Sequence, residues 1–272
     1  LDGNNTFDEG EPFEDLDGNG EFDGAWIAGF GNGRAANDVN DPVYATALAL
    51  RNGDITIVLV SLDLVGWFLN ENELIREELA MDGVDVDLLV VSSTHTHEGP
   101  DTIGIWGRTL DDSGLYAEYQ ALVRERTAQA VTEAVAALEP ANLEQVSFRL
   151  KDVDFDDDGT PDDDVTRWVG DNRDPNIVDD EVRVMRFVRA GTATAEPGSG
   201  ETISTFVNFA SHPEYTGSEN RAISSDFPHW MRRAIEDGVA EDDRFARASP
   251  GLGGITLFIN GALGVQIGPN RI

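Results

Sequence analysis

The chain has 272 residues, 40% of them hydrophobic, and it carries a formal charge of −33 with no cysteine. This composition suffices for one sizeable hydrophobic core, and it excludes a disulfide scaffold and a thiolate metal site. We expect no nucleic-acid partner, because phosphate binding needs basic surface and only 19 basic residues stand against 52 acidic ones. The acidity suits a solvated, salt-tolerant surface or the binding of cations.

No apolar run reaches the roughly 20 residues that span a bilayer, so we expect no transmembrane helix. The chain begins at Leu1 and carries no signal-like segment. A mature secreted protein and a fragment of a longer chain would both begin in this way. We expect an extracellular or periplasmic location, and the sequence leaves the oligomeric state open.

Residues 1–24 have an acidic composition of their own, and we expect them to form a calcium-binding extension. In calcium loops, oxygen ligands occupy the odd positions and glycine occupies position 6. This pattern starts at residue 15 and again at residue 154, and a shorter match covers residues 2–11. The alternative is a set of Asx-rich turns without an ion. The candidate calcium ligands are Asp15, Asp17, Asn19, Glu21 and Asp23 in one loop, and Asp154, Asp156, Asp158, Thr160 and Asp162 in the other.

Residues 25–272 are typical of an α/β domain, a mixed sheet with flanking helices and an active site at the carboxyl ends of strands. Asn70 is the expected cap of the first helix. Helical spacing predicts helices at about 70–81, 115–138 and 227–238. Apolar, β-branched runs predict strands at about 55–63, 87–94, 143–150, 181–189, 202–210 and 255–260.

Two of the predicted strands end in histidine, the commonest metal ligand in proteins. One runs into His95-Thr-His97, and the other ends at His212. Two further strands end at Asp63 and at the Asn260-Gly261 turn. Parallel strands would bring these four ends together around one crevice, with Asp63, Asn260 and Gly261 near the substrate or behind the ligands.

The other two candidate features have more modest interpretations. His229 stands in a probable first helical turn and is expected to be structural. The glycine-rich segment 29–33 follows no strand, so it favours a close backbone approach to the site over a nucleotide cradle. The sequence contains neither a G-x-S-x-G motif nor a phosphate-binding loop.

Taken in chain order, these segments resemble the neutral/alkaline (non-lysosomal) ceramidase family from about residue 25 to residue 270. The resemblance is carried by Ala28-Gly-Phe-Gly-Asn-Gly-Arg34, Asp41-Pro-Val-Tyr-Ala45, Val60-Ser-Leu-Asp63, Thr94-His-Thr-His-Glu-Gly-Pro100, Phe209-Ala-Ser-His212-Pro213 and Ile223-Ser-Ser-Asp226-Phe-Pro228. The family usually has serine where Glu98 stands. Its Gly-Asp-Val-Ser-Pro-Asn segment corresponds to Gly264-Val-Gln-Ile-Gly-Pro-Asn270, which lacks both the serine and the aspartate.

The resemblance implies a zinc-dependent hydrolase of a linear amide in which His95 and His212 are zinc ligands. The family adds a glutamate and a tyrosine from positions later than residue 272, so the chain resembles the front portion of a catalytic domain. His97 would take part in proton transfer or substrate contact, and either Arg167 or Arg173 would match an arginine of the site. Trp67, Phe68 and Trp106 are candidates for an apolar wall along an acyl chain.

Three hypotheses therefore stand. The first is a zinc amidohydrolase acting on an N-acyl sphingoid or a similar lipid. The second is a hydrolase of the same scaffold with a different substrate, suggested by the missing serine and aspartate. The third is a non-catalytic extracellular module stabilised by calcium.

Overall fold

The computed structural model describes residues 24–154, 158–161, 164–171, 173–175, 177–196, 198–240 and 248–268. The calcium-loop candidates in residues 2–23 lie outside this range, as do Asp156 and Asp162 of the later loop. The domain boundary expected after residue 24 stays a prediction for the same reason.

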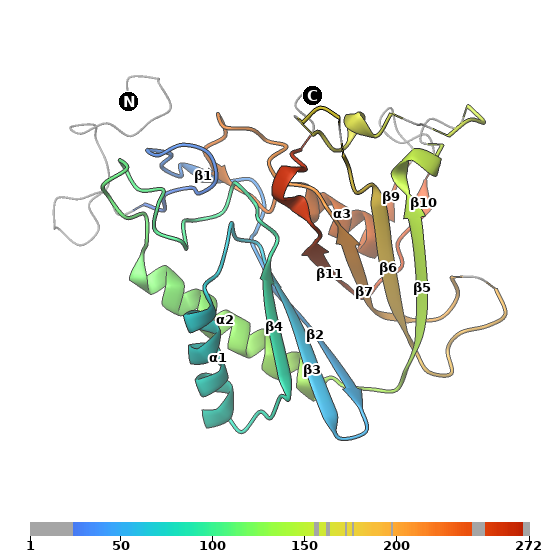
Figure 1. The fold of residues 1–272 in the computed structure, drawn as a ribbon. Coiled ribbons are helices and arrows are strands. Elements are labelled where there is room, and N and C mark those ends of the chain that lie inside the picture. The colour runs from blue at the N-terminus through green and yellow to red at the C-terminus, as the bar shows by residue number, and fades with distance from the viewer. Residues whose placement is uncertain are drawn as a thin grey trace.

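A three-stranded sheet forms the first half of the fold (Figure 1). Its strands are β2 (Ala45–Asn52), β3 (Ile55–Leu62) and β4 (Leu88–Ser93), with β2 antiparallel and β4 parallel to β3. The sequence prediction missed β2, whose alternating Ala and Leu residues lack the β-branched signature of a strand. Pairing along all of β3 overrides that weak local preference.

Two helices cover one face of this sheet, α1 (Leu69–Met81) and α2 (Ala117–Ala136). The prediction of Asn70 as the cap of α1 is wrong. The capping position belongs to Phe68, and the Asn70 amide instead donates to the Glu71 carboxylate at 2.9 Å inside the first turn. The core between helices and sheet contains Val58, Val60, Leu62, Leu64, Ile75, Leu79, Val86, Val123, Ala128 and Val131.

A four-stranded sheet, in the order β11-β7-β6-β5, forms the second half. Its strands are β5 (Ala141–Arg149), β6 (Glu181–Arg189), β7 (Thr202–Phe209) and β11 (Ile255–Asn260). Only the β11–β7 pair is parallel. Helix α3 (Phe227–Asp237) packs on β11. The short elements are β1 (Asp38–Val39) with β8 (Ala222–Ile223), β9 (Gly238–Val239) with β10 (Ser249–Pro250), η1 (Leu150–Asp152), η2 (Val165–Arg167) and η3 (Leu263–Val265).

The two sheets meet where β11 crosses the three-stranded sheet. The Ser61 hydroxyl of β3 donates to the Phe258 carbonyl of β11 at 2.5 Å, and both residues are buried. The predicted mixed α/β class is thus confirmed, with its main strands divided between two sheets. This junction brings the carboxyl ends of β4, β7 and β11 to one side of the molecule.

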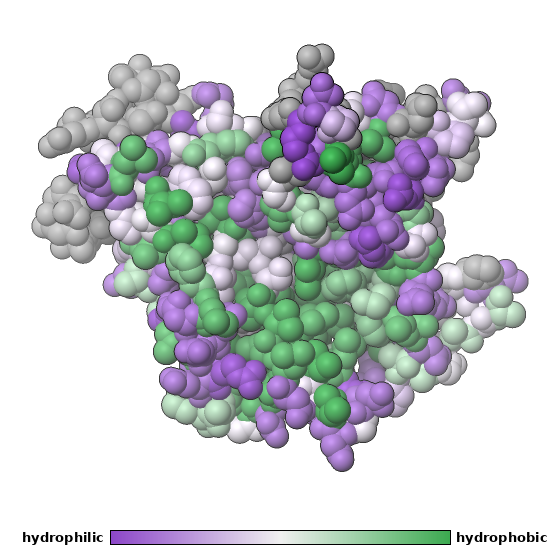
Figure 2. Space-filling view, viewed as in Figure 1, coloured by the Kyte–Doolittle hydropathy of each residue, from purple (hydrophilic) through white to green (hydrophobic). Residues whose placement is uncertain are grey.

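Hydrophobic surface gathers over the three-stranded sheet and toward the second sheet (Figure 2). Leu88 and Val90 on β4, Ile255 on β11 and Leu143 on β5 are among the exposed large hydrophobic side chains. Within the described residues, no helix combines the length and apolarity that crossing a membrane would need.

Candidate metal centre

His95 follows the end of β4 in an uncommon backbone conformation, with a φ of 68°. Its amide donates to the Leu64 carbonyl at 3.0 Å, and its Nδ1–H donates to the Val65 carbonyl at 2.6 Å. Non-glycine residues adopt a positive φ where the surroundings over-determine it, often at functional sites. The two hydrogen bonds fix the ring and leave Nε2 as its unprotonated nitrogen.

His212 lies three residues beyond the end of β7 and is anchored in the same manner. Its backbone amide donates to the Gln266 carbonyl at 3.0 Å, and its ring Nδ1–H donates to that oxygen at 2.9 Å. The Gln266 side chain is buried and donates to the Ala210 carbonyl at 2.6 Å. The segment 264–268 therefore holds this histidine through main-chain groups.

His97 is enclosed by the glycine-rich segment that follows Ala28. A Cβ at Gly29 would lie 2.4 Å from Cγ of His97, so only glycine permits this approach. The Phe30 ring meets the imidazole edge-on at 4.8 Å between centroids. The backbone amide of His97 donates to the Pro213 carbonyl at 2.9 Å. The predicted backbone approach of segment 29–33 is thus present at His97.

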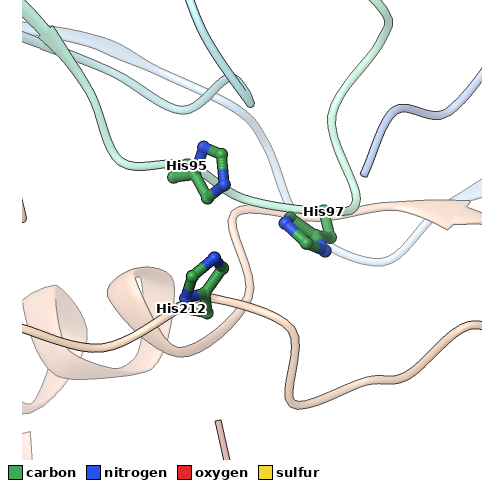
Figure 3. A group of neighbouring side chains, drawn as sticks. All are labelled: His95, His97 and His212. Atoms are coloured by element: carbon green, nitrogen blue, oxygen red, sulfur yellow. The ribbon is translucent and has the colours of Figure 1, made fainter. Parts of the chain in front are cut away.

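These three histidines form one cluster (Figure 3). One candidate ligand nitrogen per ring can be chosen so that all three lie within 4.8 Å of one another. Each ring turns a nitrogen toward the space between them, and for His95 and His212 this is Nε2, because Nδ1 is bound to a carbonyl. Such anchored Nδ1–H groups are the usual arrangement behind metal-ligating imidazoles. The group could hold a metal ion.

Burial keeps two of the rings neutral at neutral pH. Desolvation lowers the pKa of His95 below its ordinary value. Desolvation, followed by the neighbouring His95 and His212, lowers the pKa of His97 to about 3. An imidazole must be unprotonated to donate its lone pair to a metal, so this environment suits metal binding.

Asn260, at the end of β11, joins the two histidine-bearing segments directly. Its side-chain amide donates to the Thr94 carbonyl at 2.8 Å and to the Ser211 carbonyl at 2.7 Å, and its oxygen accepts from the Ser211 amide at 3.1 Å. Thr94 and Ser211 each precede a histidine of the cluster. Gly261 permits close contact behind them, because a Cβ there would lie 2.9 Å from that of Ala210.

A buried ion pair, which the sequence alone did not indicate, supports the turn that carries His97. Arg34 donates to the His97 carbonyl at 2.8 Å and to the Glu98 carboxylate at 2.7 Å, and Asn220 also donates to Glu98 at 2.7 Å. Desolvation raises the pKa of Glu98 to about 7, against the opposing effect of Arg34. Arg34 and Glu98 both stand in the motifs that carry the family resemblance, but no sequence spacing predicts a pair between residues so far apart.

Asp63 follows directly on β3, one residue beyond the strand end at Leu62, and its carboxylate forms hydrogen bonds within the protein interior. Arg232 of α3 donates to both oxygens at 3.1 and 2.6 Å, and Ser225 and the Tyr44 amide add bonds at 2.8 and 2.9 Å. The pair is buried, with side-chain exposures of 7% for Arg232 and 0% for Asp63. With four donors on two oxygens, Asp63 is suited to holding α3 against β3 rather than to contacting a substrate.

The two candidate arginines lie in the segment before β6. Arg167 ends η2, and its side chain is outside the described part of the structure. The guanidinium of Arg173 binds Asp171 through Nε at 2.9 Å and Nη2 at 2.7 Å. The Tyr215 hydroxyl donates to the Trp168 carbonyl at 2.6 Å, which places this segment beside the His212 turn. The assignment of a site arginine stays a prediction.

In the described part of the calcium-like loop at 154, Asp154 accepts from the amides of Asp158 and Gly159 at 3.1 and 2.9 Å. Asp158 accepts from the Thr160 amide at 2.8 Å, and Thr160 lowers the pKa of that carboxyl. These are the bonds of Asx-rich turns, and they leave the calcium prediction untested.

His229 lies apart from the histidine cluster, whereas Glu214 lies beside it. His229 lies in the first turn of α3, with its Nδ1 3.7 Å from Asp41 and apart from the three clustered rings. Glu214 was not among the predicted site residues, yet its carboxylate lies 3.4 Å from Nδ1 of His97. Its position two residues after His212 is a signal by which the sequence could have indicated it.

The fold has solved counterparts. No protein-family model and no curated protein matches the sequence. Among solved structures, neutral ceramidase from Pseudomonas aeruginosa matches 90% of this chain with a TM-score of 0.67 at 17% identity. A ceramidase complexed with C2 matches 90% with a TM-score of 0.64 at 18% identity. The chain spans only 37% and 36% of those two chains. The protein therefore has a neutral ceramidase-like fold over the part of that fold that it covers.

Proposed function

We propose that the protein is a zinc-dependent amidohydrolase that cleaves the amide of an N-acyl sphingoid or a similar lipid. The observation that carries the proposal is the cluster of His95, His97 and His212 at the carboxyl ends of strands in a ceramidase-like fold. Two of its rings present Nε2 inward from fixed Nδ1–H anchors. Burial lowers the pKa of His95, which adds support because zinc takes neutral imidazole.

The residues present fit zinc chemistry. His95 and His212 would hold the ion, as the sequence resemblance implies, with further ligands expected from later residues of a longer chain. A zinc ion bound there would supply a Lewis acid toward the amide carbonyl and toward water. A cluster of imidazoles disfavours metals that prefer oxygen ligands, such as calcium.

The residues of the chain itself would orient and move protons. His97 lies beside both proposed ligands, with ring centroids 5.1 Å from His95 and 5.5 Å from His212. In the proposed mechanism it accepts a proton from the attacking water and returns it to the leaving amine, a role that needs a pKa nearer to neutral in the complete site than the value of about 3 in this part of the chain. Arg34 and Gly29 hold its backbone and ring in place for that exchange.

The apolar wall proposed for an acyl chain has one well-placed member. Trp106 donates to the Phe30 carbonyl at 3.3 Å, and the Phe30 ring contacts His97. Trp67 packs against the helix-covered core, and Phe68 is half exposed ahead of α1. Of the three, Trp106 is the residue whose neighbours support a substrate contact.

Metal binding tests the proposal directly, by titrating zinc into a longer form of the chain that includes the later residues and following the heat. We expect about one zinc per chain, and the substitutions His95→Ala and His212→Ala should each abolish binding. His229→Ala is the matched control, because that ring lies outside the cluster. Binding that survives both substitutions, or that His229→Ala removes, would contradict the proposed site.

Hydrolysis of a fluorescent ceramide separates this function from a related hydrolase with a different substrate. That alternative is favoured by the segment 264–268, whose Gln266 binds backbone groups where the resemblance places a serine and an aspartate. Since the chain spans 37% of neutral ceramidase, we expect little turnover from residues 1–272 alone. Robust zinc-dependent amidase activity of this chain would contradict that expectation. Zinc binding without ceramide hydrolysis in a longer chain would favour the alternative substrate.

A further inference from the structure

The three clustered rings differ in what holds their outer nitrogen. Nδ1 of His95 and Nδ1 of His212 each bond to a backbone carbonyl, at 2.6 and 2.9 Å. Nδ1 of His97 is buried and forms no hydrogen bond with any described residue. A buried nitrogen without a hydrogen-bond partner is rare in folded proteins, so we expect a hydrogen-bond acceptor close to this atom.

Glu214 offers that acceptor. Its Oε2 lies 3.4 Å from Nδ1 of His97, which is an ion-pair distance and slightly long for a hydrogen bond. The other carboxylate oxygen accepts from the Gly268 amide at 3.0 Å, which fixes the side chain beside the ring. The carboxylate has a side-chain exposure of 15%, so water competes weakly for it.

The rest of the surroundings leaves the His97 ring little freedom. Gly29 lies against Cγ, Phe30 meets one edge, and the backbone amide is tied to Pro213, the residue before Glu214. With the ring position fixed, the remaining choice is which nitrogen carries the proton. That choice decides whether Nε2 presents a lone pair or a hydrogen toward the other two histidines.

We propose that Glu214 is a positioning residue that accepts a hydrogen bond from Nδ1–H of His97 and so directs the lone pair of its Nε2 into the histidine cluster. Carboxylates fulfil this role behind both metal-ligating and catalytic imidazoles. The inference deepens the proposed function, on which it rests for the role of His97, but the tautomer itself is independent of metal and substrate.

The test uses the metal-free chain labelled with ¹⁵N-histidine, which contains four histidines. Long-range ¹H–¹⁵N correlations at pH 7 report which ring nitrogen of His97 is protonated. We expect the Nδ1–H form in the wild type and a loss of that form, toward Nε2–H, in Glu214→Ala. His95 and His212 should keep their tautomers in the same sample, because their partners are backbone carbonyls.

Glu219→Gln is the matched control, because this glutamate is exposed on the same connection between β7 and β8. It should leave the His97 signals unchanged. The proposal is overturned if wild-type His97 is the Nε2–H tautomer, a measurement that needs no variant, or if Glu214→Ala keeps the Nδ1–H form. Zinc titration of the longer chain keeps the two proposals apart: absent zinc binding there refutes the proposed function and leaves the tautomer result standing.

Discussion

The sequence predicts a bound cation at the histidine cluster and in the loop that begins at Asp154, and the described part of the loop is built in the opposite way to the cluster. The cluster joins residues 95, 97 and 212, and its supports span the chain, as in the bonds from Asn260 to Thr94 and Ser211. In the described part of the loop, Asp154 and Asp158 accept from amides at most five residues away, and Asp158 is exposed.

The comparison separates positions set by tertiary structure from positions set by local sequence. The cluster holds its rings in fixed orientations because partners from distant parts of the chain surround them, so a distant substitution can disturb it. The loop forms from its own turn chemistry, so changes elsewhere should leave it intact and changes within it should leave the rest intact. Four predictions test this contrast.

The largest effect is expected at the buried pair of Asp63 and Arg232. Asp63→Ala leaves the Arg232 guanidinium uncompensated, which should lower the free energy of unfolding by about 3–5 kcal/mol. Asp112→Ala is the control, because its pair with Arg108 is exposed on both sides and should cost less than about 1 kcal/mol. Denaturant unfolding measures both. Equal costs for the two substitutions would contradict a stabilising role for the buried pair.

Asn260→Ala should come next, because it removes three hydrogen bonds between the two histidine segments. At about 1 kcal/mol for each bond, we expect a loss of about 2–3 kcal/mol, together with weaker zinc binding. Asn208→Ala is the matched control on β7: its amide bonds the Ile259 carbonyl without touching either histidine segment. Calorimetry of both variants should show weakened zinc binding only in Asn260→Ala. Unchanged zinc affinity in that variant would contradict the role of Asn260 in holding the two histidine segments together.

Glu98 makes the stability of the folded protein sensitive to pH. Its folded pKa of about 7 lies above the ordinary 4.5, so the protonated form contributes stability that is complete below pH 4.5. That contribution is lost as the pH rises through about 7. Glu98→Gln carries no titratable group at this position. Its free energy of unfolding, relative to that of the wild type, should therefore rise by roughly 2 kcal/mol between pH 5 and pH 8, at about 1.4 kcal/mol per unit of pKa shift. A difference between variant and wild type that stays flat across this range would contradict the assignment.

The sequence supported the predictions that depend on local pattern. The β-branched runs gave most of the strands, and the histidines that follow two of them proved to be neighbours, because the ends of β4 and β7 meet at β11. The match of the fold to neutral ceramidase confirms the resemblance read from the motifs.

Features that depend on distant partners escaped prediction. Asp63 and Arg232 are 169 residues apart, and no local sequence pattern indicates that the carboxylate points inward to α3. Strand β2 has helix-forming residues and exists because β3 pairs with it. Glu214 reaches His97 only after the turn beyond β7 folds back. The division of the strands between two sheets likewise follows from packing rather than from any one segment.

The smallest effect is expected in the calcium-like loop. Asp154→Asn without calcium should shift the melting temperature by less than about 2 °C, because it changes an exposed turn far in sequence from the buried network. Saturating calcium should raise the melting temperature of the wild type more than that of the variant, since a ligand that binds only the folded state stabilises it. Asp152→Asn, also acidic and just before the loop in η1, is the control for the change of charge. Equal calcium responses in all three proteins would show that the loop is a set of turns without an ion, and would leave the histidine cluster untouched.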